Sequence, residues 1–590
     1  MTCQVSMTGS AGAVTHRSLW LLGGLGAVLL VLAGCSSSGL HRAQAEDESE
    51  VKRYDINTVG DHTTVGNAAP MQLGGVGLVE GLEGTGGDCA HDSYRAMLAD
   101  NLRKARVPDV NKLLTSSDHA LVIVEALLPP GCSVGERIDV QVKLPPGSKA
   151  TSLRGGRLCR CYLFNYDFAR NLRPDYQGHN SLMLGNKRAV AEGPILVDCG
   201  EGDEAVRLKQ GRIWNGARVI VENPLVLVMN PRSQRGAITS LITDRINASF
   251  QGSNLGRPDN RLAFTADDKL VTLRVPPQYR HNLQRFLRVV RAVPLSDSAD
   301  TPSKNENDRR SYRQKLADDL LDPSRTVVAA LRLEALGQSS IPHLRDRGLK
   351  SSDPLVRFCS AEALAYLGSP SCGEELYRAA IAQPLLRSYA LAALSSLDEN
   401  VCRQKLRELI CSNYDDDIRY GAFHALRTLD EEDSAIAGEW LGESFWLHRV
   451  APDTPPLVHV CTARRAEVVL FGETPRLKPP FSFLAGEFAV TAADGDQRCT
   501  VSRFPLQGEP ARQQCGLDLE EVLRTMAELG GQYPEVLALL QQVQACESLS
   551  CRIRVDALPL VTPIEELVRA GKEPGELHEN ARRSAIRQTD

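Results

Sequence analysis

The chain has few aromatic residues and little net charge, and both shortages argue against a nucleic-acid-binding protein. Only 5% of its 590 residues are aromatic, and 68 basic residues are offset by 73 acidic ones. A nucleic-acid binder needs a concentrated basic face, and a single-strand binder also uses aromatic side chains on which bases stack. We therefore expect no nucleic-acid partner. The hydrophobic content of 42% is ordinary for a protein with several buried cores.

Motifs for catalysis and for metal binding are also scarce. The sequence has no H-E-x-x-H pair and no zinc box built from two cysteine pairs. The cysteines of Cys159-Arg160-Cys161 lack further ligands at suitable spacing, and on a strand both would lie on one face that could simply be buried. We expect no enzyme activity, no metal site and no cofactor.

The N-terminus is typical of an export signal. His16 and Arg17 precede 14 residues, 19–32, that are all apolar or glycine. Such a run suits a signal peptide and is too short to span the ~30 Å hydrocarbon core as a helix. It ends in small residues before Cys35, which resembles the lipobox of bacterial lipoproteins. The resemblance implies cleavage of residues 1–34, acylation of Cys35 and a lipid anchor, with Ser36 favouring the outer membrane; an ordinary signal peptide is the alternative.

Export permits disulfides, yet the 14 cysteines that would remain in the mature chain allow too many pairings to deduce. The pairs close in sequence are the best candidates for local bridges. These are Cys499 with Cys515 and Cys546 with Cys551.

The mature chain divides into segments of different pattern. Residues 35–53 form a polar tether, and residues 296–311 contain no large apolar side chain, which predicts a linker. Residues 54–295 alternate patterns of period 2 and period 3.6, which predicts an α+β domain. We expect strands over 137–144, 219–229 and 270–275, and helices from Asp92, over 238–246 and over 283–293. After the linker we expect helical repeats over 312–450, a mixed α/β module over 451–571 and a polar tail over 572–590.

The repeats are visible as four segments that end 31, 30 and 32 residues apart, at residues 337, 368, 398 and 430. Each carries two leucines and a small residue at i, i+4 and i+7, which share one helical face. The leucines are Leu333 and Leu336, Leu364 and Leu367, Leu394 and Leu397, and Leu426 and Leu429; the small residues are Ala329, Ser360, Ala390 and Ala422; three repeats add Arg357, Arg387 and Arg419. The pattern resembles short HEAT-type repeats, which implies an α-helical solenoid that binds an unknown protein.

A series of motifs in the α+β domain carries a second resemblance. In order they are residues 75–88 (GVGLVEGLEGTGGD), 122–130 (VIVEALLPP), 135–142 (GERIDVQV), 152–158 (SLRGGRL), 189–193 (AVAEG) and 212–217 (RIWNGA), followed by a helix pattern over 238–250. Their order and spacing resemble the bacterial flagellar P-ring protein family, over about residues 55–295.

The resemblance implies a structural subunit in the periplasm, at the flagellar basal body, that forms a homo-oligomeric ring around the rod beside L-ring components. Arg154 is the preferred candidate subunit contact, and its alternative role is to brace the turn within its own subunit. Arg137 and Asp139, on the solvent-facing side of the strand expected over 137–144, are further candidates for a subunit contact, with a surface pair as the alternative. The motif glycines Gly75, Gly77, Gly81, Gly84, Gly86, Gly155 and Gly156 fit tight turns and close backbone approach. The lipid anchor and the added repeats depart from the family. The alternative is therefore an envelope adaptor, anchored by lipid, that works outside the flagellum.

Overall fold

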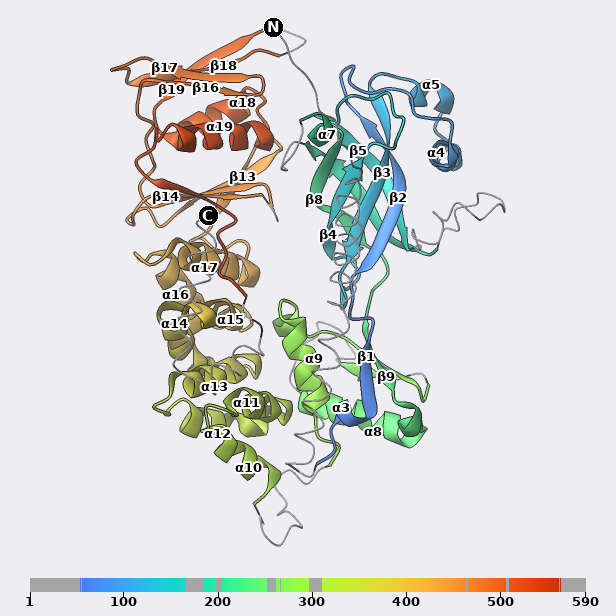
Figure 1. Ribbon diagram of the computed structural model, residues 1–590, viewed down its shortest axis with the longest axis vertical. Helices are drawn as coiled ribbons and strands as arrows, with labels where there is room; N and C mark the ends of the chain where they lie inside the picture. Colours follow the sequence, from blue (N-terminus) through green and yellow to red (C-terminus); the bar gives the residue numbers. More distant parts are fainter. Residues whose placement is uncertain are drawn as a thin grey trace, which may run out of the picture.

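The structure is a computed structural model that describes residue 54, residues 56–165, 185–197, 204–251, 261–265, 267–296, 310–462, 465–505 and 509–561, and residue 563. The expected signal peptide, Cys35, the tether, most of the linker and the polar tail lie outside the described residues. Figure 1 shows two columns that lie side by side. One column holds the α+β segment, and the other holds the helices and sheets that follow residue 310.

The α+β segment is made of two regions rather than the single domain expected. The first, which we call the closed-sheet region (residues 71–219), is a sheet in the order β4-β3-β2-β5-β6-β8-β7 that closes on itself where β4 pairs with β8. Its strands are β2 (Met71–Glu80), β3 (His119–Leu128), β4 (Arg137–Lys143), β5 (Arg157–Asn165), β6 (Lys187–Pro194), β7 (Leu196–Val197) and β8 (Gln210–Val219). The helices α4 (Ser93–Lys104), α5 (Val110–Leu114) and α7 (Glu204–Arg207) lie outside the sheet. The strict alternation of exposed and buried residues along β4 confirms the strand expected there.

The second region, the small α/β region (residues 54–66 and 225–296), carries a separate four-stranded sheet in the order β1-β9-β11-β10. Its elements are α3 (Val59–His62), β1 (Thr63–Gly66), β9 (Leu225–Met229), η1 (Pro231–Ser233), α8 (Gly236–Ser249), β10 (Ala263–Phe264), β11 (Leu270–Leu273), η2 (Pro277–Tyr279) and α9 (Leu283–Ala292). The single strand expected over 219–229 is wrong, because β8 ends at Val219 and the chain crosses between the two regions before β9 begins. Pro224 lies in that crossing, between the two sheets; a proline has no backbone N–H to donate to a sheet, so this position suits it.

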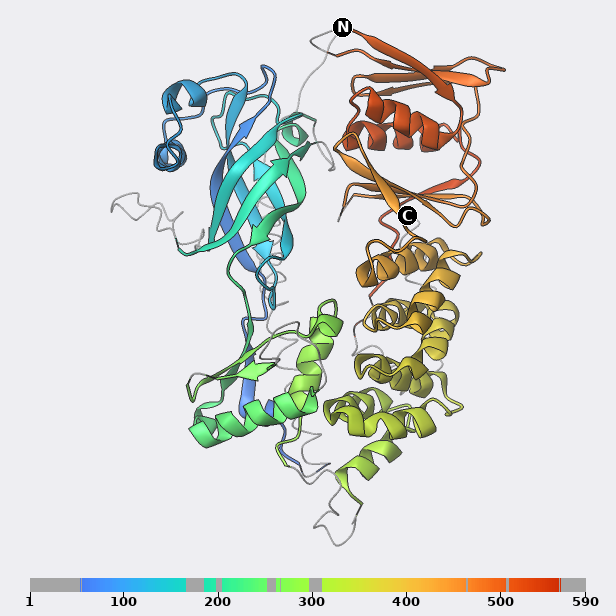
Figure 2. The same cartoon turned by 180° about the vertical axis from the view of Figure 1, so that it is seen from behind.

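The helical region (residues 310–429) stacks its helices along the second column, below the C-terminal sheets (Figure 2). Its elements are α10 (Tyr312–Asp319), α11 (Thr326–Ala335), η3 (Gly337–Ser340), α12 (Ile341–His343), η4 (Leu344–Gly348), α13 (Pro354–Tyr366), η5 (Pro370–Cys372), α14 (Gly373–Ala382), α15 (Pro384–Leu394), α16 (Asn400–Ile410) and α17 (Asp416–Leu429). The four repeat segments fall on α11, α13, α15 and α17. The small residue and the first leucine of every repeat are fully buried, as the pattern predicts.

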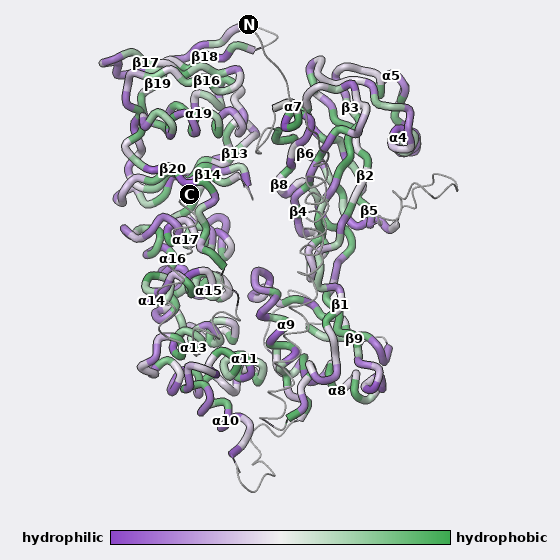
Figure 3. Tube along the Cα trace, viewed as in Figure 1, coloured by the Kyte–Doolittle hydropathy of each residue, from purple (hydrophilic) through white to green (hydrophobic). Residues whose placement is uncertain are grey.

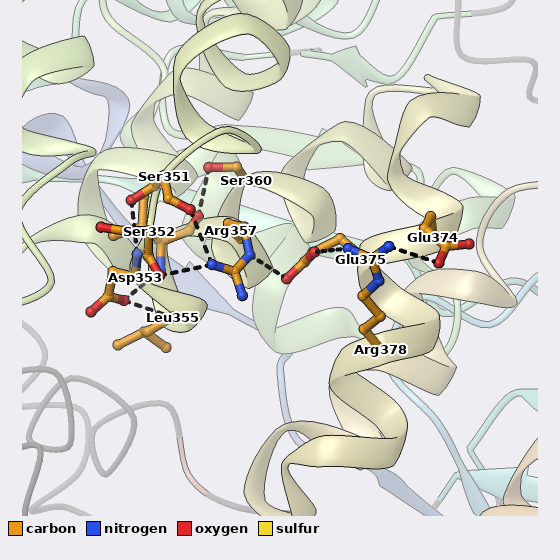
Figure 4. Close-up of polar contacts among 10 residues, drawn as sticks. Ser351, Ser352, Asp353, Leu355, Arg357, Ser360, Glu374, Glu375 and Arg378 are labelled. Carbon is orange, nitrogen blue, oxygen red and sulfur yellow. Dashed lines mark hydrogen bonds and ion pairs between the residues drawn. The ribbon is translucent and has the colours of Figure 1, made fainter.

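The repeat arginines fasten each helix start to the structure beside it. Figure 4 shows Arg357 on α13, whose Nη1 donates to the carbonyls of Ser351 and Ser352 and whose Nε donates to Glu375 of α14 at 2.8 Å. The corresponding Arg387 on α15 reaches Asp417 at 2.5 Å. Arg357 and Arg387 therefore each join a repeat helix to a carboxylate of another helix, whereas Arg419 at the same position of α17 donates to the carbonyl of Pro455 and to Thr454 Oγ1.

The C-terminal region (residues 438–555) places two helices between two sheets (Figure 1). One sheet has the order β12-β13-β15-β14-β20 and the other β16-β17-β18-β19. The elements are β12 (Gly438–Leu441), β13 (Phe445–Val450), β14 (Leu457–Cys461), β15 (Glu467–Phe471), β16 (Phe481–Ala485), β17 (Phe488–Ala492), β18 (Arg498–Arg503), β19 (Ala511–Gly516), α18 (Leu519–Glu528), α19 (Tyr533–Ala545) and β20 (Arg552–Val555). Residues 438–450, expected among the helical repeats, instead form β12 and β13, because β13 pairs with β15.

All 13 described cysteines are free thiols. Cys499 and Cys515 stand opposite each other on β18 and β19, with their Sγ atoms 3.4 Å apart. The hydrogen bond between them lowers the pKa of Cys515 to about 7. The expected pairing is therefore right in position but is a thiol contact, not a disulfide, and Cys546 and Cys551 are free as well.

Of the helices that the structure describes, none combines the length and the apolar character needed to cross a bilayer. Figure 3 shows polar residues interspersed with apolar ones along the helical region.

The buried leucines of the repeats should dominate the stability of the helical region. Leu364 and Leu394 are fully buried, so truncation of either to alanine should lower the free energy of unfolding by about 2–5 kcal/mol. The control is Leu321→Ala, because Leu321 is 39% exposed and its loss leaves no cavity. Denaturant unfolding of the chain measures the difference. Equal, small effects at Leu364 and Leu321 would contradict the buried stripe.

Candidate interaction sites

The two columns meet at a buried ionic cluster between the small α/β region and the helical region. Arg285 on α9 donates from Nη2 to Glu334 of α11 at 2.6 Å, and its Nη1 lies 2.5 Å from Glu362 of α13. The hydroxyl of Tyr279 donates to the other oxygen of Glu334 at 2.6 Å, and the ring of Tyr279 stacks on Tyr366. One side chain of the α+β segment thus holds two helices of the neighbouring column.

Burial makes this cluster an all-or-none contact. The side chains of Arg285 and Glu334 are 4% and 0% exposed, and burial raises the pKa of both Glu334 and Glu362 despite the opposing effect of Arg285. Around the cluster, one apolar core runs without a break from α9, with Phe286, into the helical region, with Leu333. We call this contact the junction. It joins the small α/β region and the helical region through a shared core.

Removing Arg285 should destabilise the protein strongly, because it would leave two buried carboxylates facing each other. Breaking one partner of a buried ionic cluster costs about 3–5 kcal/mol, so Arg285→Ala should lower the free energy of unfolding by that amount. The matched control is Arg378→Ala, since Arg378 is 65% exposed and pairs on the surface with Glu374 (Figure 4). Thermal and denaturant unfolding measure both variants. A loss at Arg285 no larger than at Arg378 would contradict the junction.

A second contact joins the columns at their other end, at the predicted contact residue Arg154. Arg154 lies in the turn before β5, where its backbone N–H donates to Ser152 Oγ at 3.1 Å. Its Nη2 donates to Glu535 at the start of α19, in the C-terminal region of the same chain. Gly486 packs against this pair, and a Cβ there would come within 2.9 Å of Arg154 Nη2. The structure therefore gives Arg154 a partner within its own chain, and its role between subunits stays a prediction.

Arg137 and Asp139 act together on a residue close to that contact. Both are exposed on β4, as expected, and both bind the backbone of Asn215: Arg137 Nη1 donates to its carbonyl at 3.3 Å, and its N–H donates to Asp139 at 2.8 Å. Asn215 has a positive φ of 53° at the irregular pairing of β4 with β8. The two residues fix the backbone next to Trp214, whose ring meets Tyr533 of α19 edge-to-face at 6.1 Å.

Trp214 and Asn215 also line a cleft of about 250 Å³ between the closed-sheet region and the C-terminal region. Gly155, Gly156, Trp214 and Asn215 line one side of it. The other side includes Trp440, Trp446, Glu443, Arg465 and Gln532. We call the contact made by Arg154, Trp214, Glu535 and Tyr533, together with this cleft, the seam. The sequence motifs identified Arg154 but gave no sign of Glu535, which lies 381 residues away.

The motif glycines lie where backbones come close. A Cβ on Gly86 would lie 2.4 Å from the carbonyl oxygen of His119, so only glycine fits there. Gly75, Gly77 and Gly156 are similarly crowded, while Gly81, Gly84 and Gly155 have positive φ. Their role is to shape the closed-sheet region.

Chemical sites are not evident in the described part of the chain. No group of three or more His, Cys, Asp or Glu side chains there could hold a metal ion. Residues 131–135 (GCSVG) fit the G-x-S-x-G pattern of nucleophile elbows. That elbow joins a strand to a helix, whereas these residues join β3 to β4, so the structural setting is wrong for it.

Comparison with known proteins agrees with the motifs. The family model described as flagellar P-ring protein matches residues 58–304. A flagellar P-ring protein of Oleidesulfovibrio alaskensis is 28% identical over 260 residues, 42% of this chain and 62% of its own length. The corresponding protein of Agrobacterium fabrum is 29% identical over 268 residues, 42% of this chain and 63% of its own length.

A third relative, the flagellar P-ring protein of Desulfotalea psychrophila, is 28% identical over 241 residues, with 38% of this chain and 55% of its own length covered. The chain thus spans less than two thirds of these relatives. The match includes the closed-sheet region and the small α/β region and ends before the helical region. The resemblance predicted from the motifs is confirmed, because residues 58–304 match the family model described as flagellar P-ring protein.

Proposed function

We propose that the protein is a structural, non-enzymatic subunit of the flagellar basal body, which forms a ring around the rod in the periplasm. The observation that carries this proposal is the match of residues 58–304 to the P-ring family. Its partners are then further copies of itself, the rod and L-ring components. A ring requires heterologous contacts that close after a fixed number of copies, and a rigid closed sheet suits such a wedge.

The helical region adds a second role within this proposal. The periodic stripe of buried leucines and the repeated arginine contacts support a short HEAT-like solenoid. Solenoids of this kind present extended surfaces to other proteins, so we assign to it a protein partner of the basal body. The C-terminal region lies in the same column as the helical region (Figure 1).

An envelope adaptor outside the flagellum is the second candidate. It is favoured by one observation, that the helical and C-terminal regions, residues 310–561, lie outside the family match. In this case the P-ring-like segment would support the solenoid without building a ring.

Deletion of the gene separates the two candidates. If the protein forms the ring, the deletion strain should lose swimming, and electron microscopy of its basal bodies should lack the ring, because no other subunit fills that position. Complementation with the full chain should restore both, and the stable Leu321→Ala variant serves as the matched control. Normal swimming with complete basal bodies would contradict the flagellar role and favour the adaptor.

The lipid anchor is tested independently. We expect Cys35→Ala to abolish acylation and to release the protein from the outer-membrane fraction, because several acyl chains on one residue anchor a protein stably, at ~0.8 kcal/mol per buried CH₂. Mass spectrometry of the N-terminal peptide and membrane fractionation measure the change. A variant that is still processed and membrane-bound would show that Cys35 is not the lipidated residue.

A further inference from the structure

The two contacts between the columns differ in kind. At the junction, a single apolar core is shared by the small α/β region and the helical region, and fully buried charges lie inside it. At the seam, the closed-sheet region keeps its own core and contributes only Leu196, with Trp214 packed against the edge, to the core of the C-terminal region. The seam is therefore a contact between two regions that each have their own core, whereas the junction is a core that two regions share.

The seam is also incompletely packed. Its cleft of about 250 Å³ is unfilled by side chains, and the buried indole N–H of Trp214 has no hydrogen-bond partner among the described residues. In the ion pair of the seam, Arg154 remains 34% exposed while the side chain of Glu535 is 7% exposed, so water reaches the pair from the Arg154 side only. Contacts with these features exchange more easily than a continuous core.

The chain geometry allows the closed-sheet region to leave the seam. The chain passes between this region and the small α/β region twice, in segments 67–70 and 220–224, of which the first is exposed, and a half-exposed ion pair of Arg280 with Glu136 at 3.2 Å also joins the two regions. Asn67 bridges the two, donating to Asn223 Oδ1 at 2.8 Å and to the carbonyl of Pro224 at 2.7 Å. A rotation there would separate the seam without breaking the junction.

We propose that the seam is exchangeable, so that the closed-sheet face around Arg154 and Trp214 docks on the C-terminal region of its own chain in the monomer and on that of a second copy in the assembly. The inference rests on the proposed ring-forming function and names the surface that builds the ring. The same complementary residues serve both contacts, as in domain swapping. Each copy then offers one closed-sheet face and one C-terminal region, which gives head-to-tail contacts.

Trp214 ties this surface to the additional region of the chain. Trp214 lies inside the motif of residues 212–217, and its ring is the one that meets Tyr533 of α19. A motif of the matched segment and the region outside the family match thus touch each other.

Charge exchange distinguishes a contact within one chain from a contact between chains. Arg154→Glu alone and Glu535→Arg alone each place like charges across the seam, both within a chain and between identical chains. An equimolar mixture of the two full-length variants restores opposite charges, but only between different chains. We expect light scattering to give monomer mass for each variant alone, and at least twice that mass for the mixture, for the wild type and for the double variant.

Two controls keep the outcome interpretable. Glu535 also caps α19 by accepting the N–H of Gln532, so circular dichroism and melting must show that Glu535→Arg is folded. If it is not, Trp214→Ala provides the test, because it weakens the seam without touching the cap and should also reduce the protein to monomer. Arg378→Glu, far from the seam, should leave the mass of the wild type unchanged.

A mixture that stays monomeric while the wild type associates would overturn the proposal, and so would association that persists in Arg154→Glu or Trp214→Ala. A wild type that is monomeric throughout would overturn it as well. These results would leave the motility test untouched, because a ring could still form through another face. A deletion strain that swims normally with complete basal bodies would instead contradict the ring-forming function, while the measured exchange between chains would still stand.

Discussion

The buried position of Arg285 between Glu334 and Glu362 sets the arrangement of the whole chain. Three ionisable groups are removed from water there, and each has its ionic partner only when α9, α11 and α13 are all in place. Buried ionic clusters contribute little net stability, but they are costly to break, so they select one arrangement over others. The P-ring-like segment and the helices after it are consequently tied into one structural unit at this end.

A similar cluster carries this constraint onward to the C-terminal region. Glu467 of β15 is fully buried and accepts a hydrogen bond from Tyr420 of α17 at 2.9 Å, with Arg427 as its ionic partner. The helical region is therefore held at both ends by buried carboxylates with arginine partners. Both α9 and β15 are thus fixed to the helical region by buried groups. The closed-sheet region keeps its own core and meets the C-terminal region as a separate body, so the seam is packed less tightly than the junction.

Local patterns in the sequence predicted the elements but not their partners. The alternation over Arg137–Lys143 and the leucine stripe of the repeats depend on neighbours within a few residues, and both are observed. The break between β8 and β9 was missed because apolar residues on both sides of it suit a strand equally well. Glu334 and Glu362 look like ordinary helix-surface residues in the sequence, since their partner Arg285 lies 49 residues before the first of them.

At the seam, too, the sequence predicted the residues of the closed-sheet region but not their partners in the C-terminal region. Arg154 and the glycines were found because their positions are constrained within the closed-sheet region; Gly86 has no room for a side chain whatever lies outside. Glu535 and Tyr533 belong to a helix that meets this face only in the folded chain. Trp214 lies on the same face, and its ring meets Tyr533 only because α19 is placed there by the fold. The internal residues of the closed-sheet region fit each other, whereas its face fits the C-terminal region, so the sequence of the segment predicts the first set of contacts and not the second.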